Sequence, residues 1–291
     1  MPSPIRIGLI GAGPWAHLAH ARAIAAHPQT VLTAVWARRP EAASELANKY
    51  GATACASVEQ LLDASEAVVF SVPPDVQERL APQAAAAGKP LLLEKPIAGS
   101  LSAAEQLAEA ASTVPTLVAL RWRYSQAVRE FIRNAHEQRP FAGRASFISG
   151  SLLAGNPFAT PWRLERGALL DLGPHVVDLL DAALGPVTAV RAHGSLQTWV
   201  GLLLEHESGA HSEASLCASI PLNPSQAGAE LFGPAGALRI DCEAAVGADA
   251  FGAMYDEFVA TARGERTATC DVARGLAIQR VLEDAENQLL R

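Results

Sequence analysis

The sequence has no long apolar run and no excess of basic charge. None of its hydrophobic stretches approaches the roughly 20 residues that span a bilayer. Acidic residues outnumber basic ones by 30 to 23, which gives a net charge of -7. This argues against nucleic-acid binding, because such proteins normally carry a basic stripe. The first four residues also lack the basic start of a signal peptide. We therefore expect a soluble, cytoplasmic protein without nucleic-acid or membrane partners.

Cysteine is scarce as well, and no two cysteines form a CxxC pair. The four cysteines are Cys55, Cys217, Cys242 and Cys270. Their wide separation fits a reducing compartment and indicates neither a redox motif nor a metal site. His17 and His20 form an H-x-x-H pair, but zinc needs further ligands nearby and the adjacent sequence offers none. We expect no bound metal.

The first 120 residues alternate apolar strands with helices. Apolar residues make up 49% of the 291 residues, enough for a sizeable core, and this length predicts about two domains. The expected strands are Ile5–Ile10, Val31–Trp36, Ala67–Val72, Leu91–Leu93 and Thr116–Leu120, and the expected helices are Trp15–His27, Glu41–Tyr50, Asp75–Ala87 and Ser102–Ser112. Continuous apolar strands alternating with helices are typical of a parallel sheet covered on both faces. The sequence therefore predicts an α/β fold with an N-terminal doubly wound sheet.

From residue 121 onward several strands follow one another. A Gly/Pro/Asn-rich stretch, Ala154–Pro161, is typical of a loop. The expected strands are Arg144–Ser149, Ala189–His193, Trp199–His206, Ser212–Ile220, Ala229–Phe232 and Leu238–Cys242, and the expected helices are Gln126–Glu137, Pro174–Ala183, Phe251–Ala262 and Val272–Leu290. Consecutive strands joined by turns favour an antiparallel or mixed sheet. We expect a second α/β domain of this kind.

A glycine turn follows the first strand. Its sequence, Gly11-Ala-Gly13-Pro14-Trp15-Ala16, is G-x-G-x-x-A at a strand-to-helix junction. In this motif the first glycine allows a tight turn, the second lets the backbone approach a pyrophosphate, and a small third residue permits close helix packing. The helix N-terminus supplies N–H groups for the phosphates. The sequence predicts a dinucleotide site that includes Gly11, Gly13, Pro14 and Trp15; the alternative is a glycine-rich turn without a ligand.

The end of the second strand indicates which dinucleotide is preferred. Sites for NAD usually carry an Asp or Glu there, which holds the ribose 2′-OH. Here Ala37 takes that position, and Arg38 and Arg39 follow. The missing carboxylate removes repulsion of a 2′-phosphate, and guanidinium groups bind phosphate well. We expect NADP to be preferred over NAD; the alternative is that the two arginines are a solvated pair at a helix entry.

A buried strand ends in Glu94-Lys95-Pro96. Ligands bind at the carboxyl ends of strands in doubly wound sheets, so Lys95 should project near the nicotinamide. We expect Glu94 and, at the neighbouring strand end, Val72 and Pro73 to contact the coenzyme too. The chain has three lysines against twenty arginines, so an inward lysine suggests that an ammonium group is needed. Pro96 restricts the backbone of Lys95, and a cis bond there would fix its aim. A structural role for Lys95 fits the residues equally well.

A second informative segment contains Asp171, Pro174, His175 and Asp178. Pro174 suits the first turn of a helix. His175 would then sit at a helix N-terminus, where the dipole keeps the imidazole neutral. Histidine is the usual acid or base near neutral pH, and Asp178 lies within reach of the same helix face. The sequence of this segment is equally compatible with a structural interpretation, in which Asp171 caps the helix and His175 is an ordinary core residue.

The chain resembles the glucose–fructose oxidoreductase / inositol 2-dehydrogenase / MocA family. The resemblance rests on the GxGxxA turn, the E-K-P strand end and the D-x-G-x-H-x-x-D segment, and it covers nearly the whole chain. It implies a Rossmann domain at 1–120 and a substrate-binding α/β domain at 121–291, with an open mixed sheet through which members form dimers or tetramers. It also implies oxidation of hydroxyls or reduction of carbonyls on sugars and polyols, with Lys95, Asp171 and His175 as catalytic groups.

The expected reaction is reversible hydride transfer between NADP(H) and a secondary alcohol or ketone of a sugar-like substrate. His175 would exchange the hydroxyl proton, Lys95 would hold the reacting oxygen, and Asp171 would keep Lys95 charged. The expected substrate contacts are Arg123, Tyr124, Trp162, Arg163 and His175.

Two other functions stay open at this point. One is a regulator that binds NADP and a sugar without turnover, and the other is a glycoside hydrolase that uses its coenzyme transiently. The paired carboxylates of an ordinary glycosidase cannot be identified. The chain departs from the family pattern at Ala37, at Arg166-Gly167 and over the stretch Arg121–Tyr124, so the sequence does not determine the substrate.

Overall fold

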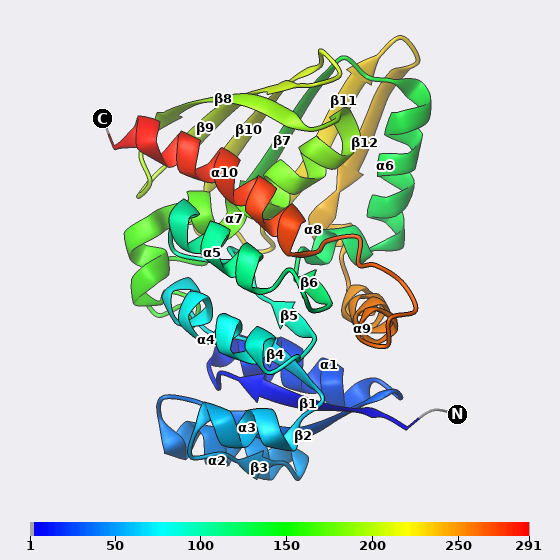
Figure 1. The fold of residues 1–291 in the computed structure, drawn as a ribbon. Coiled ribbons are helices and arrows are strands. Elements are labelled where there is room, and N and C mark those ends of the chain that lie inside the picture. Colours follow the sequence, from blue (N-terminus) through cyan, green and yellow to red (C-terminus); the bar gives the residue numbers. More distant parts are fainter. Residues whose placement is uncertain (1–2, 291) are drawn as a thin grey trace. The chain divides into compact units, whose positions relative to one another are not determined.

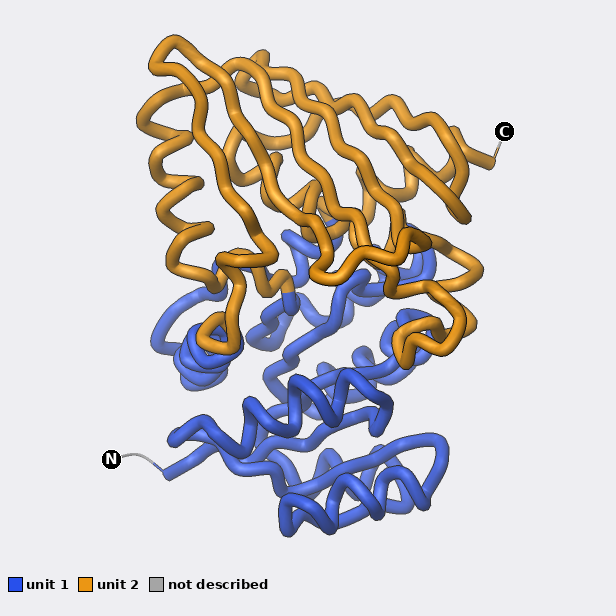
Figure 2. Tube along the Cα trace, turned by 180° about the vertical axis from the view of Figure 1, so that it is seen from behind, with its two compact units in different colours: residues 1–119, 251–276 blue, residues 120–250, 277–291 orange. Residues whose placement is uncertain are grey.

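The computed structural model describes residues 3–290, which form two compact units. The first unit contains residues 1–119 and 251–276, and the second contains residues 120–250 and 277–291 (Figure 2). The chain passes from the first unit to the second at residue 120, close to the expected boundary. Segment 251–276, which was expected in the second domain, belongs to the first unit. The N–H of Val118 donates to the Cys270 carbonyl at 2.6 Å, and the N–H of Val272 donates to Thr116 Oγ1 at 3.0 Å. These bonds join the returning segment to the last strand of the first sheet.

The first unit contains a parallel sheet of six strands, which confirms the predicted Rossmann fold. The strand order is β3-β2-β1-β4-β5-β6 (Figure 1). The strands are β1 (Ile5–Ile10), β2 (Thr30–Trp36), β3 (Thr53–Ala54), β4 (Ala67–Phe70), β5 (Leu91–Leu93) and β6 (Thr116–Val118). Strand β3 was not predicted, because its two exposed residues carry no apolar pattern. The helix after it, α3 (Val58–Ala64), was not predicted either, although it buries Val58, Leu61 and Leu62.

Helices connect these strands and cover the sheet. The connecting helices are α1 (Ala21–Ala26), α2 (Pro40–Tyr50), α4 (Pro74–Ala86) and α5 (Leu101–Ala110), and a π-helical turn at Ala16–His20 precedes α1. The returning segment adds most of α9 (Asp249–Ala262) to this unit. The central strands are buried on both faces: Leu9, Val69 and Leu92 are all fully buried. This is the burial that continuous apolar strands predict. Among residues 3–290, no helix is long and apolar enough to cross a membrane.

The second unit contains a mixed open sheet, as predicted. Its order is β12-β11-β7-β10-β9-β8, with β7 and β10 parallel and the other neighbours antiparallel. The strands are β7 (Ala142–Ile148), β8 (Val187–Gly194), β9 (Val200–His206), β10 (His211–Cys217), β11 (Gln226–Gly233) and β12 (Gly236–Asp241). The other elements are a 3-10 turn at Arg121–Tyr124, α6 (Gln126–Gln138), α7 (Pro161–Leu184), α8 (Cys242–Ala245) and the later part of α10 (Val272–Leu289).

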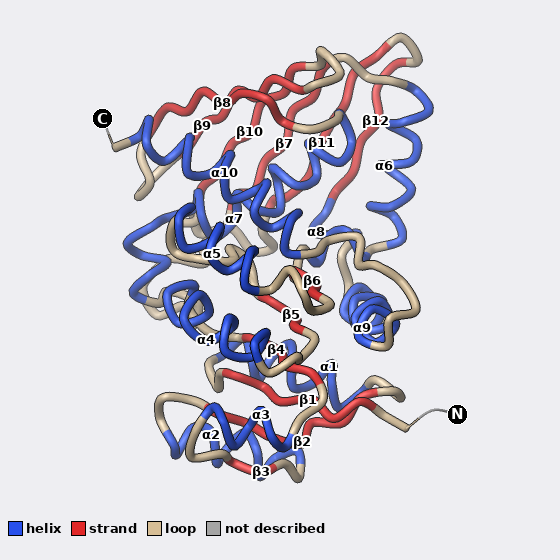
Figure 3. The backbone as a smooth tube through the Cα atoms, in the orientation of Figure 1, coloured by secondary structure: helices blue, strands red, loops and turns tan. Residues whose placement is uncertain are grey.

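Helix α7 covers one face of this sheet, and the later part of α10 lies on the same face (Figure 3). The expected helix start at Pro174 is wrong. The helical segment α7 begins at Pro161, is interrupted by a kink at Gly167 (φ 65, ψ -160) where two helices meet, and continues through Pro174. An interior proline costs about 3 kcal/mol. That cost is outweighed here because nearly every side chain from 167 to 184 is buried, including Leu169, Val176 and Leu180 at 0% exposure. His175 therefore lies inside a helix, and the dipole argument for a neutral ring does not apply.

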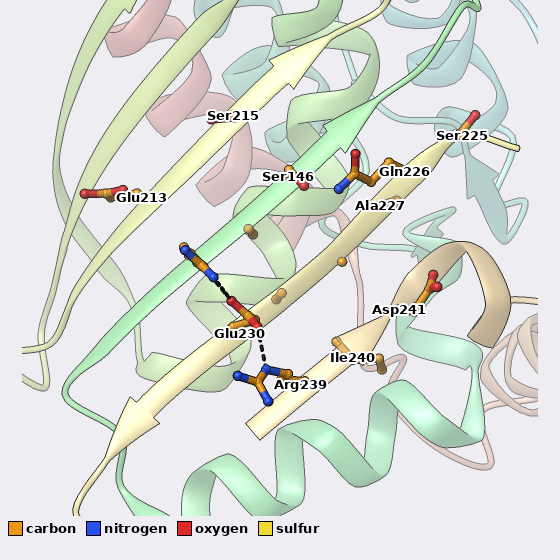
Figure 4. Close-up of a pocket in the computed structure, with 14 residues that line it drawn as sticks. Ser146, Glu213, Ser215, Ser225, Gln226, Ala227, Glu230, Arg239, Ile240 and Asp241 are labelled. Atoms are coloured by element: carbon orange, nitrogen blue, oxygen red, sulfur yellow. Dashed lines mark hydrogen bonds and ion pairs between the residues drawn. The ribbon is translucent and has the colours of Figure 1, made fainter. Parts of the chain in front are cut away.

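The opposite face of the sheet is polar and carries a row of alternating charges. Neighbouring strands pair Arg239 with Glu230, Glu230 with Arg144, and Arg144 with Glu213. Glu230 accepts a hydrogen bond from Arg239 Nε at 2.5 Å and also binds the Arg144 guanidinium (Figure 4). Small residues such as Gly228 lie beside this row and leave a shallow hollow of about 680 Å³.

Candidate active site

The glycine turn has the geometry that a dinucleotide requires. Gly11 has φ +118, and a Cβ there would lie 2.1 Å from the Ser71 carbonyl oxygen and 3.0 Å from Val72 Cγ1. Only glycine fits this position. At Gly13 a Cβ would meet no atom within 4 Å, so the backbone faces open space where a pyrophosphate can approach. Ala16 is fully buried, which explains the small third residue of the motif.

A carboxylate network lies beside Lys95. Glu94 Oε1 accepts hydrogen bonds from Trp15 Nε1 at 2.6 Å and His20 Nε2 at 2.7 Å. Glu94 Oε2 accepts the backbone N–H of Lys95 at 3.2 Å. Burial would raise the pKa of Glu94, but His20, the charge of Lys95 and the Trp15 hydrogen bond outweigh burial and lower it. His20 is fully buried, and its Nδ1 lies 3.0 Å from the Tyr255 hydroxyl.

The backbone around Lys95 is held from a neighbouring helix. Gln77 on α4 is fully buried, and its Oε1 accepts the N–H of Glu94 at 2.8 Å. Its Nε2 donates to the carbonyls of Glu94 at 2.8 Å and Ile97 at 2.9 Å. The Lys95–Pro96 peptide bond between them is cis. The amide of Gln77 thus satisfies both backbone groups of Glu94 and fixes where the Lys95 side chain starts.

The remaining predicted coenzyme contacts lie at strand ends of the same sheet. Ala37 follows β2 and is half-buried, whereas Arg38 and Arg39 are exposed. Neither guanidinium has a hydrogen bond or ion pair with any of residues 3–290. Pro14 is exposed within the glycine turn, and Pro73 directly precedes α4. The two arginines are therefore available to an anionic ligand.

In the second unit, the bend of α7 places Arg163 against Asp171. Arg163 Nε donates to Asp171 Oδ1 at 3.0 Å, eight residues along the chain. In a straight helix eight residues correspond to a rise of about 12 Å, so the bend at Gly167 is what permits this contact. The Arg163 guanidinium also lies 4.6 Å from the Trp162 ring centroid. The structure thus brings one predicted catalytic residue and two predicted substrate residues together.

His175 is packed among aromatic rings. Its side chain is 5% exposed and stacks on Trp122, with 5.3 Å between ring centroids and 21° between planes. Phe147 on β7 lies 6.5 Å away on centroids. These rings fix the plane of the imidazole. Neither aromatic neighbour was predicted from the sequence, since both are distant from His175 in the chain.

The other predicted substrate residues lie in the turn at Arg121–Tyr124. Arg123 Nη1 donates to Asp178 Oδ1 at 3.0 Å, and the Asp178 side chain is 1% exposed. Tyr124 is buried, and the Arg129 guanidinium lies 5.5 Å from its ring centroid. Asp178, which the sequence placed within reach of His175, is thus the partner of Arg123.

Two family models match the chain. Residues 5–120 match an oxidoreductase family with an NAD-binding Rossmann fold, and residues 125–239 match the GFO/IDH/MocA C-terminal domain. The chain belongs to the GFO/IDH/MocA oxidoreductase family. The predicted resemblance is confirmed, and with it the pairing of a coenzyme-binding unit with a mixed-sheet unit.

Named members of the family include sugar dehydrogenases. Glucose-6-phosphate 3-dehydrogenase of Bacillus subtilis (strain 168) is 29% identical over 186 residues, 60% of this chain and 52% of that protein. Levoglucosan dehydrogenase of Pseudarthrobacter phenanthrenivorans is 28% identical over 218 residues, 67% of this chain and 55% of that protein. The chain thus spans about half the length of the curated relatives it matches.

A solved structure shares the fold over the full chain. GenD2 from gentamicin A biosynthesis, crystallised in complex with NAD, superposes with a TM-score of 0.87 at 23% identity. The match covers 100% of this chain and 95% of GenD2. This GFO/IDH/MocA chain therefore has the fold of an NAD-bound relative.

Several residues of the candidate site were missed by sequence reasoning. Gln77 and Tyr255 carry no motif, and only the fold brings them to Glu94 and His20. His20 was weighed as half of a possible metal pair, yet its partners are a carboxylate and a phenol. His20 lies on an apolar face of its helix, and this position could have predicted a buried histidine whose ring nitrogens are hydrogen-bonded within the protein. No group of three His, Cys, Asp or Glu side chains in the described part of the chain is arranged as metal ligands would be.

Proposed function

We propose that this protein is a dehydrogenase or reductase that prefers NADP and acts on a secondary alcohol or ketone of a sugar-like small molecule. One observation carries the proposal. Lys95 is fixed at the carboxyl end of β5, in the same sheet whose β1 ends in the open Gly13 turn. The names of the relatives support a sugar as substrate, because both relatives described above are sugar dehydrogenases.

Each residue has a definite task in this proposal. The bound coenzyme supplies hydride acceptance or donation at its nicotinamide ring. Lys95 holds the reacting oxygen and stabilises negative charge that develops on it. His175 exchanges the hydroxyl proton, with its ring plane set by Trp122. Asp171, oriented by Arg163, hydrogen-bonds the substrate.

Turnover by two variants tests the assignment. Nicotinamide absorbance is followed with NADP⁺ or NAD⁺ and pools of sugars and polyols. Lys95→Ala and His175→Ala should each lower turnover about a hundredfold or more, the scale of one acid–base group. Lys89→Ala is the matched control, because Lys89 only donates to the Ser65 carbonyl at 2.8 Å in the same unit. Wild-type turnover in both site variants would exclude these roles.

The preference for NADP is tested by binding. Arg38 and Arg39 are exposed where the acidic residue of NAD sites is replaced by Ala37. A charged hydrogen bond is worth about 1.5–3 kcal/mol, so Arg38→Ala and Arg39→Ala should each weaken NADPH binding about tenfold or more. NADH binding should stay within about twofold of wild type. Arg22→Ala, an exposed arginine of α1, is the control. Equal or tighter NADH binding by the wild-type protein contradicts the preference.

We also propose that two copies associate through the polar face of the second unit's sheet. The row Arg239, Glu230, Arg144 and Glu213 alternates in charge across four strands. Consider two copies that face each other across a two-fold axis lying in the interface, perpendicular to the row and through its centre. The second copy then presents the row in reverse order, so that each charge lies opposite a charge of the other sign. The row is therefore complementary to its own reversed copy.

Mass in solution tests the association. Light scattering should give a dimer, or a tetramer built from it, at low salt, and Glu230→Arg should give a monomer because three like charges then adjoin. Glu137→Arg, an exposed carboxylate of helix α6 and not of the sheet, is the control. A monomer at every concentration of the wild-type protein would contradict the proposal. We also propose a cytoplasmic location, which the wide separation of the four cysteines supports.

A further inference from the structure

The first unit has a hollow of about 600 Å³ that lies away from the glycine turn. It is enclosed by the end of α5, the start of β6, the end of α9 with the chain that follows it, and the first turn of α10, and we call it the β6 hollow. Thr116 lines it and is the first residue of β6, whereas the glycine turn follows the last residue of β1. Because the strands between them are parallel, these two points lie at opposite ends of the sheet. The β6 hollow is therefore separate from the coenzyme site, which lies at the carboxyl ends of the strands.

A buried hydroxyl group beside the β6 hollow has no partner. Thr261 lies in the last turn of α9, lines the hollow and is 4% exposed. Its Oγ1 forms no hydrogen bond with any of residues 3–290. A threonine in a helix often donates to a carbonyl one turn back, and a buried hydroxyl without a partner is unfavourable. An oxygen atom of a bound ligand would accept this proton.

A guanidinium group lines the same hollow. Arg266 follows α9, and its side chain is 53% exposed. Its Nη2 lies 3.2 Å from Oε2 of the buried Glu257, which fixes the guanidinium in place. A guanidinium carries several N–H donors in a rigid plane, so the contact with Glu257 uses only part of them. Arg266 is therefore suited to bind an anionic group in the hollow.

The remaining lining supplies a further donor, an acceptor and an apolar wall. Thr116 Oγ1 accepts the N–H of Val272 at 3.0 Å and still has a proton to donate. Asp271 Oδ1 accepts the N–H of Arg274 at 2.9 Å. This carboxylate disfavours a bare anion but accepts hydrogen bonds from ligand hydroxyls. The apolar wall consists of Ala108, Ala111, Val114, Pro115, Ala268 and Leu276.

We propose that the β6 hollow binds a small organic anion that carries several hydroxyl groups, of the class of sugar phosphates and sugar acids. Arg266 and the hydroxyls of Thr261 and Thr116 bind the anionic group, Asp271 accepts hydrogen bonds from ligand hydroxyls, and the apolar wall covers the C–H face of the ligand. The volume of about 600 Å³ lies in the range of small-molecule sites, about 300–1,000 Å³. The proposal does not depend on the reaction assigned above.

Calorimetric titration of the full chain tests the site. Ribose 5-phosphate and gluconate are the probes for the two kinds of anion, and ribose and inorganic phosphate each lack one half of the required chemistry. Excess NADP⁺ is present throughout, so that the glycine turn is occupied. At least one organic anion should bind saturably, with ribose and phosphate at least about tenfold weaker. If neither anion binds with a Kd below about 10 mM, or if ribose or phosphate binds as tightly, the proposal is wrong.

Thr261→Val separates ligand binding from structure. Valine has a similar shape without the hydroxyl, so the affinity for the organic anion should fall about fivefold. The Tm of the ligand-free variant should be unchanged or higher, because a buried unpaired hydroxyl has been removed. Thr113→Val is the matched control, since Thr113 is exposed and lies outside the lining of the hollow. Unchanged affinity in Thr261→Val contradicts the proposal, whatever the Tm.

Arg266→Gln tests the charge. It should weaken binding of the organic anion at least about tenfold, and Arg266→Lys, which keeps the charge, should recover part of this loss. Arg263→Gln is the matched control, because Arg263 donates to the Ser3 carbonyl at 3.2 Å and lies outside the lining. Wild-type affinity in Arg266→Gln would mean that the anion binds elsewhere and would overturn the proposal. These titrations need no turnover, so they decide the role of the β6 hollow even if no sugar or polyol is oxidised.

Discussion

Replacing Gly167 by alanine should destabilise the second unit more than any surface glycine replacement. Gly167 has φ 65 and ψ -160, a region that only glycine adopts readily. Holding another residue there costs about 1–3 kcal/mol. An added Cβ would also lie 1.9 Å from the backbone oxygen of Leu196, which must move, at a cost of about 1–3 kcal/mol for overpacking. The expected loss in the free energy of unfolding is about 4 kcal/mol.

Thermal and urea unfolding measure this loss. About 4 kcal/mol corresponds to a fall in Tm of about 8–16 °C for a unit of this size. Gly155→Ala separates strain from clash, because Gly155 has φ +85 but a Cβ there would meet no atom within 4 Å. This control should lose about 1 kcal/mol. If both variants lose the same stability, the close approach of Leu196 is not a determinant of the bend and the reasoning is refuted.

The bend also has a consequence for the candidate site. Gly167 lies between Arg163 and Asp171, whose contact depends on the change of direction there. Gly167→Ala should therefore lower turnover even where the protein remains folded. Coenzyme binding should change little, since the glycine turn belongs to the other unit. A folded variant with wild-type turnover would show that the Arg163–Asp171 contact is not needed.

Three further predictions follow from buried polar groups of the second unit. Glu286→Gln should cost about 3 kcal/mol in urea unfolding, because Arg166 binds both oxygens of Glu286 at 2.9 and 2.6 Å; a loss below about 1 kcal/mol contradicts this. Burial lowers the pKa of His206 below 6.5 despite its bond to the Gly185 carbonyl, so the unfolded chain binds more protons and stability present above about pH 6.5 is lost as pH falls. Thermal melts of His206→Gln should show a flatter slope between about pH 7 and 5, and an unchanged slope argues against it. Burial raises the pKa of Cys242 to about 12, so iodoacetamide at about pH 8 should modify Cys242 only in denaturant; mass spectrometry of its native peptide checks this, and rapid native labelling excludes it.

Much of the fold was predictable because it depends on local patterns. Continuous apolar runs such as Leu91–Leu93 indicated strands buried on both faces, and the order of strands and helices indicated a doubly wound sheet. Consecutive strands after residue 121 indicated the mixed sheet. The two-residue strand β3 was missed because a short exposed segment carries no periodic signal. Helix α3 was missed although Val58, Leu61 and Leu62 follow a helical spacing over its seven residues.

The helix start at Pro174 shows where a local rule fails. Proline is favoured at the first position of a helix because its fixed φ suits that position, and this preference depends only on near neighbours. In α7 this preference was outweighed by burial, since almost every side chain from 167 to 184 is buried. The preference was correct for another residue, because Pro161 occupies the first turn of the same helix.

The sequence by itself determined which residues form the glycine turn, the Lys95 strand end and the Asp171–His175 segment. Those motifs depend on residue type and on near neighbours, which the sequence displays directly. Only the tertiary structure decided their partners: Trp15 and His20 for Glu94, Trp122 for His175 and Arg163 for Asp171. A partner 50 to 80 residues away, or across a bend, is chosen by the packing of whole elements. Pair contacts of this kind leave no pattern in the sequence, because the intervening chain can take any length.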